Sequence, residues 1–87
     1  MLEIRFTQAA RKHRIGRASV RHVMATVTPA GTVTAQGNLA WVYTGDDERG
    51  RELEVIAVEI GQEEGQDPFL LVIHAMPTSL RKRNRDV

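Results

Sequence analysis

The sequence contains no cysteine. Disulfide bonds and thiolate metal sites are therefore excluded, and the absence of thiols fits a reducing compartment. Composition alone still permits a metal site built from histidine and carboxylate side chains. However, no spacing of His and Glu in the chain matches a recognised metal motif. Serine-nucleophile and phosphate-loop patterns are absent as well. We therefore expect neither a bound metal nor a cofactor.

Long apolar runs are also missing. The longest run, Phe69–Pro77, contains His74 and is too short to span a bilayer. Glu3 and Arg5 stand where a signal peptide would have its apolar core. We therefore expect a cytoplasmic protein with no membrane contact. Because the chain has 87 residues and no internal repeat, residues 1–87 are expected to form a single small domain.

The net charge is only +1, but the charges are unevenly distributed: acids are scarce near both ends of the chain, and bases are scarce in the middle. Up to Gly45 the only acid is Glu3, whereas acids outnumber bases between Asp46 and Asp67, and the C-terminal end is basic again. Two basic ends that meet in the fold would create a local positive field able to hold phosphates. Alternatively, the charges are solvated surface groups, or the basic ends neutralise the acidic middle within the molecule.

The first part of the chain predicts a strand and two helices. Residues 2–6 alternate between apolar and charged side chains, as strands do. Thr7 can cap a short helix over about residues 8–12, which are mostly good helix formers. A second helix is predicted over about residues 17–27, because its apolar residues form one stripe at helical spacing. These residues are Val20, Val23, Met24 and Val27.

Three strands are predicted after this helix, at about residues 39–44, 52–60 and 69–77, with a loop or weak edge strand before them. The connections between them favour an antiparallel meander. A short basic helix is predicted after Thr78, which can cap it. The predicted fold class is therefore α+β: a small antiparallel sheet of about three or four strands, backed on one face by two N-terminal helices, with a short C-terminal helix.

A register follows if the loop between the last two strands is symmetric. Glu54 then lies opposite His74. In this arrangement the helices cover the sheet face that contains Leu71 and Ile73. The opposite face contains Val72 and His74, and its polar end holds two carboxylates.

Three short motifs resemble those of the BrnT-like toxins. They are the turn Lys12-His13-Arg14-Ile15 with Val20 after it, the hairpin from Gly45 to Ile56, and the late strand that leads through His74-Ala75-Met76 to a basic helix. The family has a KHG-type turn after its first helix, a glycine–Asp–Gly–Arg hairpin, and a late strand that ends in an Ile-Ser-Ala-Arg pattern before a helix. The chain departs from the family at Arg14, which replaces glycine, and in the late strand, where the arginine is missing.

The resemblance implies a toxin of a bacterial type II toxin–antitoxin pair, related to the RelE-type ribonucleases, that cleaves mRNA without a metal. Its partners would be RNA and a cognate antitoxin protein that holds it inactive. Metal-free RNA cleavage needs a base for the 2′-hydroxyl proton, positive groups at the phosphate and an acid for the leaving oxygen. The candidate catalytic residues are His13, Glu54, His74 and Arg81. The candidate nucleic-acid-binding residues are Lys12, Arg14, Arg17, Arg21, Lys82 and Arg83.

Each candidate has a structural alternative. His74 lies in an apolar run and can be a core histidine that is satisfied by a neighbour such as Glu54. His13 and the bases around it can form a solvated helix end. Trp41 and Tyr43 are expected in the core and not to stack on bases. The alternative function is a small non-enzymatic domain that binds nucleic acid or a protein through its basic ends, and association into a homo-oligomer stays open.

Overall fold

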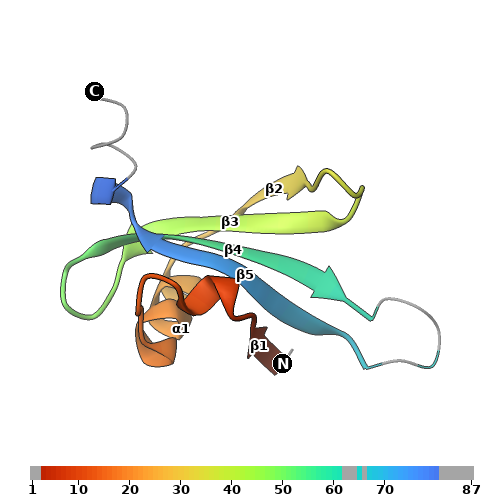
Figure 1. Ribbon diagram of the computed structural model, residues 1–87, viewed down its shortest axis with the longest axis horizontal. Coiled ribbons are helices and arrows are strands. Elements are labelled where there is room, and N and C mark those ends of the chain that lie inside the picture. Colours follow the sequence, from red (N-terminus) through yellow and green to blue (C-terminus); the bar gives the residue numbers. More distant parts are fainter. Residues whose placement is uncertain (1–2, 62–64, 66, 81–87) are drawn as a thin grey trace.

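The computed structural model describes residues 3–61, 65 and 67–80, and its five strands form one mixed sheet (Figure 1). The strands are β1 (Glu3–Phe6), β2 (Ala30–Val33), β3 (Leu39–Asp46), β4 (Glu52–Ile60) and β5 (Phe69–Pro77). They lie in the order β1-β5-β4-β3-β2, in which β1 is parallel to β5 and every other pair of neighbours is antiparallel.

Between β1 and β2 the chain forms the 3-10 helix η1 (Ala9–Arg11) and the α-helix α1 (Arg17–Thr26). Both lie on the same side of the sheet (Figure 1), which we call the helix face. The opposite side, which no element of the described residues covers, is the open face.

Two features of the predicted fold are wrong. The sheet has five strands with mixed pairing instead of three or four antiparallel ones, and α1 is the only helix longer than one turn among the described elements. The first predicted helix is short because Arg14 adopts the left-handed conformation, with φ 56°, and Gly16 is extended. η1 therefore has only three residues, although Thr7 Oγ1 still accepts a hydrogen bond from Ala10 N–H at 3.1 Å.

The register between β4 and β5 also differs from the predicted one. His74 faces Ile56, and Glu54 faces Met76. Because this displacement amounts to two residues and the side-chain period of a strand is two, His74 and Glu54 still point to the same face of the sheet.

A β-bulge at Ile73 divides β5 into two halves. Ala57 of β4 faces Val72, whereas the residue before it faces His74, so β5 has one residue more than β4 at this point. A one-residue insertion reverses the alternation of side chains along a strand. Val72 therefore lies on the helix face with 0% exposure, where the prediction had placed Leu71 and Ile73.

The core lies between α1 and the helix face. Val20 and Val23 of α1 are 1% and 0% exposed, which confirms the predicted apolar stripe. They belong to one packed cluster with Leu53 and Val55 of β4, both fully buried. Burial of side chains on this scale is the main force that holds a domain of this size together.

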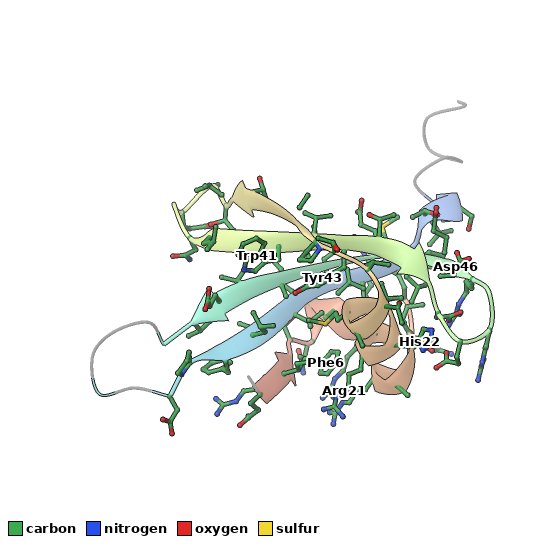
Figure 2. The ribbon with its side chains drawn as sticks, turned by 180° about the vertical axis from the view of Figure 1, so that it is seen from behind. Phe6, Arg21, His22, Trp41, Tyr43 and Asp46 are labelled. Carbon is green, nitrogen blue, oxygen red and sulfur yellow. The ribbon has the colours of Figure 1, made fainter. Side chains whose placement is uncertain are left out.

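β3 adds two aromatic residues to this core, as predicted. Tyr43 is 7% exposed, and Trp41 packs against the cluster from farther along the strand (Figure 2). β3 also carries Gly45 where Val27 follows the end of α1. A methyl group at Gly45 would overlap Val27 Cγ1, so only glycine permits this approach.

The β3–β4 hairpin is held by a buried carboxylate. Asp47 is 4% exposed, and its Oδ1 accepts hydrogen bonds from the backbone N–H groups of Arg49 and Arg51, both at 2.9 Å. Its Oδ2 accepts two more from the Arg51 guanidinium, at 3.1 and 3.0 Å. Burial raises the pKa of the Asp47 carboxyl, but these hydrogen bonds lower it by more, so the net shift is downward. Ser19 of α1 donates a hydrogen bond to Glu48, which ties the hairpin to the helix.

Candidate functional site

His74 and Glu54 lie together on the open face. Their strand neighbours Ala75 and Val55 are buried in the core at 1% and 0% exposure, so alternation directs His74 and Glu54 to the opposite side. They are diagonal neighbours on adjacent strands, because Glu54 pairs with Met76. Nε2 of His74 is 3.2 Å from Oε1 of Glu54. The predicted contact is therefore formed, although the register that suggested it was wrong.

The imidazole of His74 has one buried and one accessible side. Nε2 is buried without an aligned hydrogen-bond partner, whereas the side chain as a whole is 32% exposed. The 3.2 Å approach to Glu54 Oε1 is therefore a close polar contact whose N–H direction is poor. Nε2 therefore faces the Glu54 carboxylate, while part of the His74 side chain is accessible to solvent.

A second carboxylate, Glu52, stands beside this pair. It lies two residues before Glu54 on the same strand and therefore on the same face. Thr78 is 4% exposed, and its Oγ1 donates a hydrogen bond to Glu52 Oε1 at 2.6 Å. This bond fixes the place where the chain leaves β5. The sequence predicted Thr78 only as a helix cap. The spacing of two residues between Glu52 and Glu54 predicted that they share a face of the sheet.

Residues 78–80, which follow β5, are helical, in line with the start of the predicted C-terminal helix. The rest of that predicted helix lies outside the described residues. The candidate residues on it are Arg81, Lys82 and Arg83.

His13 is separated from the His74–Glu54 pair by the sheet. It lies in the segment between η1 and α1 and is half-buried. Both helices are on the helix face (Figure 1), whereas the pair is on the open face. The structure therefore does not bring His13 into one site with His74 and Glu54.

The helices η1 and α1, together with the turn between them, carry a group of exposed bases that we call the basic surface. It consists of Arg11, Lys12, Arg14, Arg17 and Arg21. Within residues 3–61, 65 and 67–80, none of these side chains is paired with a carboxylate. The Arg17 guanidinium lies over the ring of Phe6, 5.6 Å from its centroid, and Arg21 points away from the sheet (Figure 2). Exposed cations at this density create a positive potential that attracts polyanions.

Arg11 is the member of the basic surface that the candidate residues omitted. The sequence could have indicated it, because Arg11 directly precedes the three candidates Lys12, His13 and Arg14.

In the part of the chain that the structure describes, no helix is long and apolar enough to cross a membrane. The same residues contain no group of three or more histidine, aspartate or glutamate side chains that could hold a metal ion. No known protein family, curated protein or solved structure compared with the chain matches it. The likeness to the BrnT-like toxins therefore stays a prediction.

Proposed function

We propose that the chain is the toxin of a bacterial type II toxin–antitoxin pair and cleaves mRNA in the cytoplasm without a metal, with His74 and Glu54 as its acid–base pair. The observation that carries the proposal is the 3.2 Å approach of His74 Nε2 to Glu54 Oε1 on a sheet face that no described element covers. The resemblance of the early turn and the hairpin to BrnT-like toxins points to the same reaction.

The chemistry follows from the orientation of the imidazole. With Nε2 turned toward Glu54, Nδ1 is the nitrogen left to take the proton from a ribose 2′-hydroxyl. The 2′-oxygen then attacks the adjacent phosphorus, the bond to the 5′-oxygen breaks, and the imidazolium of His74 returns its proton from Nδ1 to that leaving oxygen. Glu54 stabilises the imidazolium formed in the first step, as a carboxylate does for a catalytic histidine in general.

Positive charge for the phosphate is assigned to the C-terminal bases. Arg81, Lys82 and Arg83 follow Leu80 in the sequence. The Thr78–Glu52 hydrogen bond supports this assignment, because it holds Thr78, three residues before Arg81, next to a carboxylate on the face of Glu54. Cations near the scissile phosphate stabilise the charge that develops in the transition state. His13 has no role in this chemistry, because it lies on the helix face.

A second candidate function is nucleic-acid binding without cleavage. The observation that favours it is the basic surface, whose exposed side chains have no carboxylate partner among the described residues. It would hold the phosphate backbone and not read the base sequence, because contacts to phosphate carry little sequence information.

The test is incubation of the purified chain with end-labelled single-stranded RNA in the presence of EDTA. We expect cleavage that leaves 2′,3′-cyclic phosphate ends, and a loss of about a hundredfold in rate for His74→Gln and for Glu54→Gln. His22→Gln is the matched control, because His22 is exposed on α1 and its side chain makes no hydrogen bond or ion pair with the described residues. Full activity of His74→Gln would contradict the assignment of the pair.

Binding without turnover would select the second candidate. In that case affinity should fall steeply with salt, and replacement of Arg17 and Arg21 by glutamine should reduce the slope of this dependence. Failure to arrest the growth of a bacterial host on expression, together with no cleavage in vitro, would remove the toxin proposal.

A further inference from the structure

β2 is the last strand of the sheet, and no strand of the described residues pairs with its outer edge. All four of its residues are exposed. The direction of its backbone groups follows from Thr34 N–H, which donates to Asn38 C=O at 2.9 Å. Because hydrogen-bonded pairs alternate along an antiparallel ladder, Ala30 and Thr32 also bond to β3. Gly31 and Val33 therefore direct their N–H and C=O groups to the open edge.

This edge lacks the protection that edge strands usually have. Charged side chains, prolines or bulges normally prevent such strands from pairing with another chain. The sequence has 12 basic and 11 acidic residues, but none between Thr28 and Gly45, the segment that contains β2 and most of β3. Val33 and Leu39, which face each other across β2 and β3, are 64% and 39% exposed and are the exposed large apolar side chains of the described chain.

We propose that β2 pairs antiparallel with β2 of a second copy of this chain, around a two-fold axis that passes between the two Thr32 residues. Gly31 of one copy then faces Val33 of the other, and the symmetry repeats this pair on the far side of the axis. These are the residues whose backbone groups point outward, so each pair exchanges both of its hydrogen bonds. The five-stranded sheets of the two copies become one continuous sheet.

Alternative registers are poorer. A shift that places Gly31 on the axis would set Val33 opposite Pro29, which has no N–H to donate. A shift by a single residue would place paired side chains on opposite faces of the two sheets, which a two-fold axis perpendicular to the sheet does not allow.

The packing on the helix face supports the same register. The indole of Trp41 lies over Gly31, where a Cβ would come within 3.2 Å of its ring. Trp41 and Val33 share this face, because Gly31 pairs with Trp41 and Val33 is two residues farther along. Val33 of the second copy would therefore reach the edge of the indole across Gly31. This contact removes from water the most exposed large apolar side chain of the described residues.

The association is expected to depend on concentration, because a short pair of edge strands buries less surface than a standard protein interface. It is independent of the proposed catalytic function, since β2 is separated from the His74–Glu54 pair by β3 and part of β4.

The test is the solution mass of the full chain, measured by sedimentation equilibrium over about three orders of magnitude in concentration. We expect the mass to rise from 9.7 kDa toward twice this value. Val33→Lys places a charge on the edge and should raise the dimer dissociation constant by about tenfold or more. Gln36→Lys adds the same charge in the exposed turn between β2 and β3, away from the edge, and should associate like the unmodified chain.

A second variant and a second measurement distinguish loss of the dimer from loss of the fold. Val33→Pro removes an outward N–H that has no partner within the sheet, together with the valine side chain, and should also weaken the dimer. The circular dichroism of each variant reports whether it is folded. Trp41 is the only tryptophan, so its emission should shift with concentration in the unmodified chain and not in folded Val33→Lys. A mass of 9.7 kDa at every concentration, or equal association of Val33→Lys and Gln36→Lys, would overturn the proposal.

Discussion

The helix face and the open face belong to the same sheet but differ in what shields their side chains. On the helix face, Leu53, Val55 and Val72 reach 0% exposure beneath the helices. On the open face, Ala40 and Val58 reach 1% and 5%, but they lie outside the core cluster. One face therefore carries most of the stability, which leaves the other free to hold polar groups such as the His74–Glu54 pair.

The largest expected effect is the loss of unfolding free energy on truncation of a buried side chain, which should differ between the two faces. Leu53→Ala should lower the free energy of unfolding by about 3 kcal/mol, because it removes a fully buried side chain and leaves a cavity. Ile56→Ala, on the open face of the same strand, should lower it by about half as much, because Ile56 is only half-buried. Urea unfolding followed by circular dichroism measures both, and equal losses would contradict the division of stability between the faces.

The next effect concerns the approach of α1 to β3. Gly45→Ala should cost about 2 kcal/mol in unfolding free energy, since its methyl group would overlap Val27 Cγ1. Gly16→Ala is the matched control and should cost less than about 1 kcal/mol, because no atom lies within 4 Å of the added Cβ. In the Gly45→Ala background, Val27→Ala should recover part of the loss. Additive losses in this double variant would show that the two residues do not constrain each other.

A smaller effect is expected at the polar end of the open face. Thr78→Val removes the hydrogen bond to Glu52 and should lower the unfolding free energy by about 1 kcal/mol. Thr44→Val is the control, because Thr44 is exposed on the same face and its side chain makes no hydrogen bond with the described residues. Thermal unfolding of both variants should show a lower melting temperature for Thr78→Val only. If Thr44→Val lost as much, the hydrogen bond to Glu52 would not be the cause.

The smallest effect is a pH dependence in the hairpin that closes this end of both faces. The pKa of the Asp47 carboxyl is lower in the folded chain than its usual value, so the carboxylate stabilises the fold above about pH 4. This contribution is lost as the pH falls through the lowered pKa. The melting temperature of Asp47→Asn should therefore lie below that of the unmodified chain at neutral pH, and the difference should shrink in acid. Asp46→Asn is the control on the exposed end of β3, and an equal pH-dependent difference there would contradict the role of Asp47.

The sequence predicted most elements of the fold because their patterns are local. The spacing of Val20 and Val23 marks the buried stripe of α1, and the apolar run from Phe69 to Pro77 matches β5. The first helix was predicted to be short, but not to form only the 3-10 turn Ala9–Arg11, because propensity does not separate such a turn from an α-helical one. The pairing of β1 with β5 joins distant segments, and no local pattern reports it.

The candidate site was predicted in part and for a partly wrong reason. A symmetric loop set Glu54 opposite His74, whereas the true register is displaced by two residues and brings them together diagonally. His74 and Glu54 still share a face of the sheet, because a displacement of two residues preserves the alternation of side chains. The predicted sheet already placed the helices on the face opposite His74 and Glu54, so the separation of His13 from this pair was implied, but the candidate catalytic residues combined both faces.

The bulge at Ile73 gives β5 a place that can absorb changes in chain length. The half of β5 before the bulge pairs with β1 and places Val72 in the core, whereas the half after it presents His74 on the open face. Loss of one residue at the bulge would merge the two halves into a regular strand and need not turn either Val72 or His74 over. Between His74 and Pro77 the strand has no bulge. Loss of one residue there would move the side chains that follow to the opposite face of the sheet. Length variation among natural or engineered versions of this chain should therefore be tolerated at Ile73 and nowhere else along the strand.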